Sequence, residues 1–124
     1  MAIIIVASRK YKIDGDGMTS RALEELRFLL RMGLVEPEKF KKATLCYNAG
    51  KGMGEEGTPE YYPLKFYSEE TKEEIWLSQV TAGYRGTGPS GTIEALKIMG
   101  FPVNVALEEE IKTKKITDEI YMKP

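Results

Sequence analysis

The sequence contains no histidine and only one cysteine among its 124 residues. Without histidine, the chain lacks the side chain that most often acts as a general base or metal ligand, and every Ser-His or Cys-His pair is excluded. A single cysteine, Cys46, excludes an intrachain disulfide and fits a reducing compartment. It lies in the apolar run 43–47, where we expect a buried, inert thiol. We therefore predict no metal site, no cofactor and a cytoplasmic protein, in the host cytoplasm if a phage encodes it.

The chain also lacks an excess of either charge, because its 18 basic and 19 acidic side chains give a net charge of −1. Proteins that bind a polynucleotide usually carry a basic excess, because their affinity comes from neutralising phosphates. We therefore expect no polynucleotide partner, although Arg9, Lys10 and Lys12 form a local basic cluster. This cluster lies in the segment 9–17, which we expect to be a polar loop. The apolar run 2–7 is too short to span a membrane, and its basic residues follow it, unlike those of a secretory signal. We predict no membrane partner.

The overall composition predicts one ordered domain over residues 1–124, because 42% of the residues are hydrophobic and 30% are charged. The hydrophobic patterns predict strands over 2–8, 44–49, 61–68, 74–82, 102–107 and 112–122, and helices over 19–32 and 92–99. The strands 61–68 and 74–82 are expected to form a hairpin joined by the charged turn 69–73. Strands grouped between two helices favour an α+β fold, in which a mixed, mostly antiparallel sheet has two helices packed on it. We expect 2–8 to be a buried central strand, and Pro63 to place 61–68 at a sheet edge.

The first predicted helix has an apolar side and a polar side. We expect Thr19 or Ser20 to cap it and Gly33 to end it. Its apolar stripe consists of Ala22, Leu23, Leu26, Leu29, Leu30 and Gly33. Its polar side consists of Arg21, Glu24, Glu25, Arg27 and Arg31, with Phe28 and Met32 at the edge.

The most informative segment is the glycine-rich loop 83–91, which joins a predicted strand to a predicted helix. Gly86, Gly88 and Gly91 satisfy the pattern G-x-G-x-x-G. Glycines allow successive backbone N–H groups to converge on one point, and the first N–H groups of a helix are unpaired and partly positive. A phosphate or carboxylate can accept several of these hydrogen bonds. The segment therefore predicts an anion site, although it can also be a tight turn stiffened by Pro89.

Side chains around this loop supply further candidate contacts. Arg85 can offer a bidentate cation, and Tyr84 can offer a stacking face for a base. Lys51 lies in a second glycine-rich loop that follows Asn48, and it can reach an anion held by the first loop. The predicted ligand-binding residues are Tyr84, Arg85, Gly86, Thr87, Gly88, Ser90, Gly91, Thr92, Lys51 and Asn48. Glu108 stands about where a dinucleotide-binding motif has its ribose contact, but the short helix after the loop argues against that fold.

The segment Tyr84-Arg-Gly-Thr-Gly-Pro-Ser-Gly-Thr92, which leads into 93–101, resembles the glycine-rich turn of small phage proteins, the Thoeris anti-defence sponges. The resemblance covers this segment alone. It implies an oligomeric α+β protein that captures a cyclic ADP-ribose-type immune signal without cleaving it.

We thus predict non-catalytic sequestration of a phosphate-containing, nucleotide-like small molecule. We expect a homo-oligomer, because ligand sites often form where subunits meet. One alternative is a small enzyme that acts on a nucleotide or phosphorylated metabolite, since carboxylates, Lys51, tyrosines and arginines can still serve as acids and bases. Another is a protein-binding inhibitor subunit whose interface contains Phe28, Met32, Tyr61 and Tyr62.

Overall fold

A computed structural model describes residues 3–6, 10–46, 52–53, 59–60, 62–83, 85–115 and 119–123. The strands are β1 (Ile3–Val6), β2 (Lys10–Ile13), β3 (Lys42–Leu45), β4 (Gly52–Met53), β5 (Pro59–Glu60), β6 (Leu64–Ser68), β7 (Glu73–Leu77) and β8 (Glu119–Met122). The helices are α1 (Thr19–Arg31), α2 (Thr87–Ile98) and α3 (Val105–Thr113), with short 3-10 turns at Gly15–Gly17 and Pro37–Lys39. This is the α+β fold that the sequence predicts, and the described residues contain three α-helices in place of the expected two.

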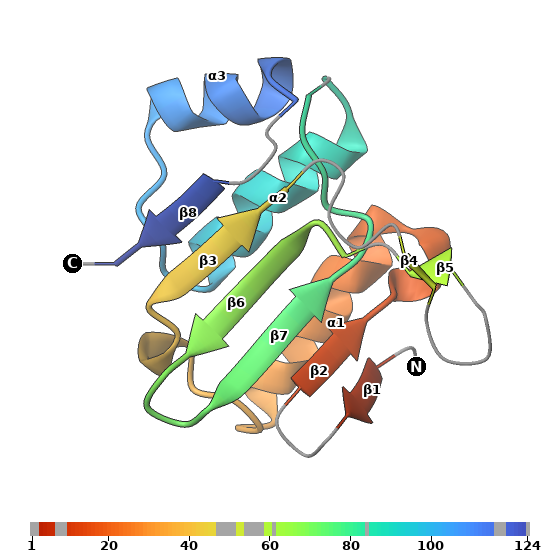
Figure 1. The fold of residues 1–124 in the computed structure, drawn as a ribbon, viewed down its shortest axis with the longest axis vertical. Helices are drawn as coiled ribbons and strands as arrows, with labels where there is room; N and C mark the ends of the chain where they lie inside the picture. Colours follow the sequence, from red (N-terminus) through yellow and green to blue (C-terminus); the bar gives the residue numbers. More distant parts are fainter. Residues whose placement is uncertain are drawn as a thin grey trace.

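The main sheet has the strand order β1-β2-β7-β6-β3-β8. Strands β2 and β7 run parallel, and the other neighbouring pairs run antiparallel, so the sheet is mixed and mostly antiparallel as predicted (Figure 1). Strands β4 and β5 form a separate small ribbon. Because α1 follows β2 and α2 follows β7, both helices begin at the same end of the two parallel strands.

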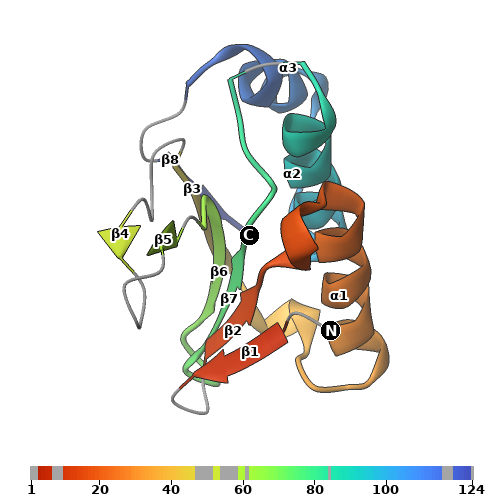
Figure 2. The same cartoon turned by 90° about the vertical axis from the view of Figure 1, so that its right-hand side faces the viewer.

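The molecule has two layers, with all three helices on one side of the main sheet and the β4–β5 ribbon on the other (Figure 2). Helix α1 packs against α2, and α2 packs against α3. The core lies between sheet and helices and contains alternate residues of the strands. Its fully buried side chains include Ile13, Leu45, Leu64, Phe66, Ile75, Leu77, Leu26, Leu29, Leu96 and Met99.

The prediction for the first helix is confirmed in its extent. Ala22, Leu26 and Leu29 are buried as expected. Gly33 ends the helix with a φ of 70°, and the next amide, of Leu34, donates a hydrogen bond back to the Leu29 carbonyl at 3.0 Å. This left-handed turn is the C-terminal cap for which glycine is preferred.

Two expectations for this helix are wrong. The N-cap is Met18 rather than Thr19 or Ser20, and it makes no side-chain capping bond. The Thr19 hydroxyl instead donates to the Gln79 carbonyl at 2.8 Å. Glu25, expected on the polar side, is only 4% exposed. Helical spacing places Glu25 beside Ala22 and Leu29, so the helix buries a wider arc than its apolar residues indicate.

The N-terminal strands differ from the prediction. Residues 10–13 were expected in a polar loop, but Lys-Tyr-Lys-Ile forms β2, with Tyr11 and Ile13 buried. Insertion of β2 leaves β1 at the edge of the sheet, so 2–8 does not supply the expected central strand. The segment alternates, with Lys10 and Lys12 outward and Tyr11 and Ile13 inward, but the two lysines make it resemble a polar loop.

The prediction of a hairpin over 61–82 is confirmed, since β6 and β7 pair antiparallel around a turn. Its placement at a sheet edge is wrong, because β6 lies between β7 and β3. Pro63 precedes β6, and its carbonyl accepts a hydrogen bond from the Cys46 amide at 2.9 Å. Its missing N–H therefore costs the ladder of β6 nothing. Cys46 itself is half-buried rather than buried.

The strand predicted over 102–107 is also wrong. Asn104 caps helix α3 by accepting a hydrogen bond from the Leu107 amide at 2.8 Å. Ile111 is buried on the inner side of this helix. Residues 112 and 113 of the predicted strand 112–122 belong to α3 instead, whereas residues 119–122 form β8 at the edge of the sheet. In the part of the chain that the structure describes, every helix is too short or too polar to cross a membrane.

Candidate functional site

The predicted glycine loop is in large part the beginning of a helix. Helix α2 starts at Thr87, whereas the sequence pattern predicts a start at Thr92. Gly88, Ser90 and Gly91 consequently lie in its first turns. The Ser90 amide donates to the Gly86 carbonyl at 3.2 Å, and the Thr81 amide donates to the Gly88 carbonyl at 3.3 Å. Pro89 fits here because the first amides of a helix have no partner within the helix.

Gly91 allows α1 and α2 to approach each other closely. A Cβ atom on Gly91 would fall well inside van der Waals contact of Thr19 Cγ2 and within 3.2 Å of Val80 Cγ1. The buried Thr92 hydroxyl donates to the Thr81 carbonyl at 2.6 Å. Gly88 is buried as well. Three of the predicted ligand contacts, at 88, 91 and 92, therefore have a visible packing role.

The other predicted contacts are scattered. Arg85 forms an ion pair with Glu109 of α3, and both side chains are more than half exposed. Thr87 lines a hollow of about 400 Å³ between the beginnings of α1 and α2, together with Gly17, Met18, Thr19, Ser20, Gln79 and Thr81. Tyr84, Lys51 and Asn48 lie outside the described residues. Ligand binding by this segment therefore stays a prediction.

A different cluster lies on the side of the sheet opposite the helices. We call it the lysine–aromatic face and define it by the outward side chains of four neighbouring strands: Lys10, Lys12, Glu74, Trp76, Lys65, Tyr67, Lys42 and Thr44. The strand register arranges them in two rows across the sheet. One row reads Lys10, Glu74, Tyr67, Lys42, and the other reads Lys12, Trp76, Lys65, Thr44.

Trp76 is at the centre of this face and is contacted by three lysines. The Nζ atoms of Lys65, Lys10 and Lys12 lie 4.0, 4.1 and 5.4 Å from an indole ring centroid. The ring of Tyr62 lies 5.9 Å away, centroid to centroid, at a tilt of 54°. The indole Nε1–H donates to Glu74 Oε1 at 2.9 Å. The ring is thus held in one orientation while cations gather around it.

One lysine of this face, Lys65, has a lowered pKa. Burial lowers the pKa of Lys65 from the ordinary 10.5, and the charges of Lys10 and Lys12 lower this pKa further. Glu74 and Cys46 act in the opposite direction without cancelling the effect. An anion placed here would reduce the repulsion among the lysines.

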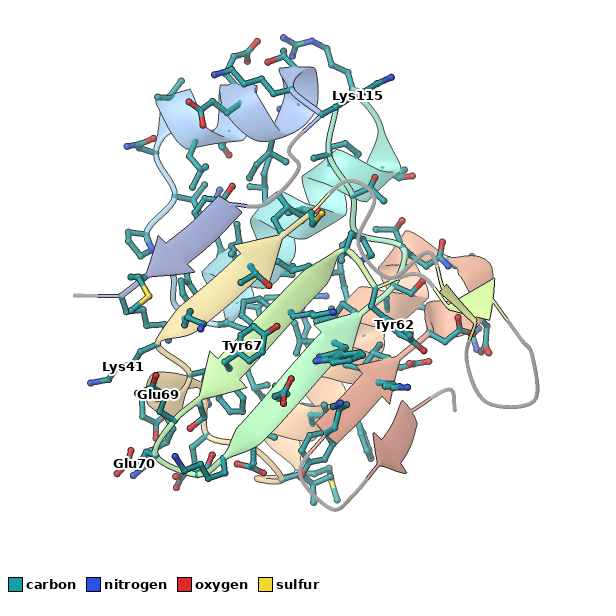
Figure 3. All side chains as sticks on the ribbon, viewed as in Figure 1. Lys41, Tyr62, Tyr67, Glu69, Glu70 and Lys115 are labelled. Atoms are coloured by element: carbon teal, nitrogen blue, oxygen red, sulfur yellow. The ribbon has the colours of Figure 1, made fainter. Side chains whose placement is uncertain are left out.

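The face continues into a hollow at the other end of β6. Lys42 Nζ lies 5.0 Å from the ring centroid of Tyr67, which lies in front of β6 in Figure 3. The hollow has a volume of about 600 Å³ and is lined by Lys39, Lys41, Lys42, Lys72, Lys123, Tyr67, Met122, Glu69 and Glu70. Glu70 is engaged by Lys39 at 3.0 Å. The lysines outnumber the carboxylates, so this end also favours an anion.

Sequence reasoning located only part of this face. It noticed the basic residues at 9, 10 and 12 but assigned them to a loop. The signal that was available is alternation: Leu-Lys-Phe-Tyr-Ser and Glu-Glu-Ile-Trp-Leu each place a large apolar residue inward and a lysine or aromatic residue outward. Which strands lie side by side cannot be read from either segment alone.

Comparison with known proteins gives no match: no protein family, no curated protein and no solved structure corresponds to this chain.

Proposed function

We propose that the protein binds and sequesters a nucleotide-like ligand on the lysine–aromatic face, with a base against an aromatic ring and a phosphate among the lysines. The observation that supports the proposal is the position of Lys10, Lys12 and Lys65 around Trp76. Bases stack on aromatic rings, and lysine ammonium groups bind phosphate as point charges. Both requirements are met within one cluster.

The lysines that contact the indole do not prevent a base from stacking there. A partly exposed cation–π contact contributes about 0.5–1 kcal/mol. Stacking of a base on an aromatic side chain contributes about 1–3 kcal/mol. The displaced ammonium gains a phosphate partner in return. The exchange of a lysine for a base is therefore favourable.

We further propose that the ligand is held without chemical change. The sequence has no histidine, the commonest general base. The cations on this face are lysines, whose ammonium groups bind an anion as point charges. A ligand released by heating should therefore be recovered intact, and recovery of an altered product would contradict this part of the proposal.

The single tryptophan makes the proposal directly measurable. Nucleoside mono-, di- and triphosphates, a cyclic dinucleotide and a cyclic ADP-ribose derivative are titrated while the fluorescence of Trp76 is recorded. Stacking should quench this fluorescence, and calorimetry should give the same dissociation constant. If none of these ligands binds, the proposal is wrong.

A matched pair of lysine substitutions tests the location. Lys65→Ala removes a cation from the lysine–aromatic face. Lys97→Ala removes from α2 an exposed cation whose Nζ atom donates to Glu108 Oε1 at 3.3 Å. Affinity should fall for Lys65→Ala and remain unchanged for Lys97→Ala. Equal losses in both variants would show a non-specific charge effect.

A further inference from the structure

We infer that the ligand of the lysine–aromatic face is a single-stranded nucleic acid, with successive bases on Trp76 and Tyr67. This inference rests on the function proposed above and specifies its ligand. The evidence is the arrangement of two aromatic residues on neighbouring central strands, combined with a row of cations that continues beyond both of them.

Trp76 and Tyr67 are diagonal neighbours on β7 and β6. Trp76 is directly opposite Lys65, and Tyr67 is directly opposite Glu74, so the two aromatic residues are offset by two positions. Diagonal residues on adjacent strands are separated by about 7–8 Å. This spacing exceeds the rise of about 3.4 Å per nucleotide in a stacked strand. It suits a chain whose bases are splayed apart, as proteins that recognise single strands require.

Cations follow the line from one aromatic residue to the next. Lys10, Lys12 and Lys65 surround Trp76, and Lys42 lies 5.0 Å from the Tyr67 ring centroid. Beyond Tyr67, the hollow of about 600 Å³ adds further lysines. One nucleotide cannot contact cations along this whole line, whereas a strand with several phosphates can.

The overall charge of the chain does not contradict this inference. The net charge of −1 is a sum over the whole molecule, but a phosphate strand responds to the nearby potential. On the lysine–aromatic face, four lysines stand against one carboxylate, Glu74, which accepts the indole N–H. The face is therefore locally basic although the chain is not.

A duplex is a poorer occupant than a single strand. Its bases are paired and stacked inside the helix, so they cannot stack on Trp76 or Tyr67. A duplex can use only the phosphate contacts of the same lysines. Comparison of a single strand with the duplex of the same sequence therefore separates stacking from simple charge attraction.

The experiment compares three probes by fluorescence titration of the full chain: a single strand of about eight nucleotides, its duplex and the corresponding mononucleotide. The single strand should bind at least about tenfold more tightly than either of the others. Tyr67→Ala should weaken binding of the single strand at least about fivefold and leave the mononucleotide unaffected. Trp76→Phe should retain stacking, as measured with a labelled strand. Trp76→Ala should weaken binding of both the single strand and the mononucleotide.

The outcomes separate this inference from the proposed function. If the mononucleotide binds as tightly as the single strand, or if Tyr67→Ala changes neither affinity, the inference is wrong and the nucleotide site remains. If no probe binds, both fail. Lys97→Ala serves as the matched control, and thermal unfolding of each variant shows that loss of binding is not loss of folding.

Discussion

The two faces of the main sheet contain alternate residues of the same strands but differ completely in chemistry. On β6, Leu64 and Phe66 point toward the helices and are fully buried. Lys65 and Tyr67 point the other way and are half-buried. The inner face gains its free energy from burial of apolar surface. The outer face lies outside that core and carries lysines and aromatic rings. If this division is correct, substitutions on the two faces should differ in their effects on stability and binding.

Phe66→Ala and Tyr67→Ala should destabilise the protein to very different extents although the residues are adjacent. Phe66 is fully buried and lies 5.5 Å from the ring of Phe101. Its truncation should lower the free energy of unfolding by about 3–5 kcal/mol. Tyr67→Ala should lower it by less than about 1 kcal/mol. Urea denaturation measures both values, and similar losses would contradict the division between the faces.

Trp76→Ala should affect binding more than stability. Loss of the stacking surface should weaken binding of a nucleotide by about 1–3 kcal/mol, which is about 5- to 150-fold in the dissociation constant. The indole is only partly buried, so the denaturation midpoint should change little. Calorimetry measures the affinity of this variant, which has no tryptophan fluorescence. If the affinity is unchanged, Trp76 does not contact the ligand.

Gly91→Ala should destabilise the helix pair by about 1–2 kcal/mol. Overpacking against Thr19 costs about 1–3 kcal/mol, and the higher helix propensity of alanine returns at most about 1 kcal/mol. Thr19 cannot rotate away freely, because its hydroxyl bonds the Gln79 carbonyl. Thermal unfolding measures the loss.

A second substitution tests that explanation. Thr19→Ser removes the methyl group that a Cβ on Gly91 would contact but retains the hydroxyl. The double variant of Gly91→Ala with Thr19→Ser should recover most of the lost stability. If it recovers none, the glycine is required for a different reason, such as the anion site that the sequence predicts.

Ligand affinity should fall as the pH rises toward 10.5. The pKa of Lys65 is lowered by burial and by neighbouring lysines, so this side chain loses its charge at a lower pH than an ordinary lysine. The protonated form binds phosphate, and the loss therefore begins below 10.5. In Lys65→Arg the charge persists, and the affinity should depend less on pH. Lys97→Arg should retain the dependence of the wild type.

Arg85→Ala should have the smallest effect. The ion pair of Arg85 with Glu109 is exposed, so its loss should cost at most about 0.5 kcal/mol of stability. Nucleotide affinity should not change if the ligand occupies the lysine–aromatic face. A clear loss of affinity would instead support the glycine segment 83–92 as the ligand site.

The sequence predicted the elements whose signals are local. The apolar stripe and terminal Gly33 defined α1, and the charged turn at 69–73 defined the hairpin of β6 and β7. Prediction failed where a short segment has two interpretations. Lys-Tyr-Lys-Ile lies in the polar segment 9–17, whose turn residues 14–17 predict a loop, but it forms β2. The segment 102–107 is predicted as a strand, although Asn104 caps a helix there.

The glycine pattern shows the limit of a motif. Gly86, Gly88 and Gly91 have the spacing of a phosphate-binding loop, but close approach of two helices also requires a residue without a side chain. Only the position of Thr19 against Gly91 reveals that second requirement. The motif alone does not distinguish a ligand from a neighbouring helix.

The sequence by itself determined that this chain forms an α+β domain, and that it contains no histidine for catalysis or metal binding. These conclusions follow from the amino-acid composition and from hydrophobic patterns within short segments, and neither depends on how distant segments pack. The tertiary structure decided that lysines from β2, β3 and β6 gather with Trp76 of β7 on one face. Such a cluster depends on which strands are neighbours and in what register, and these are set by packing of residues far apart in the chain.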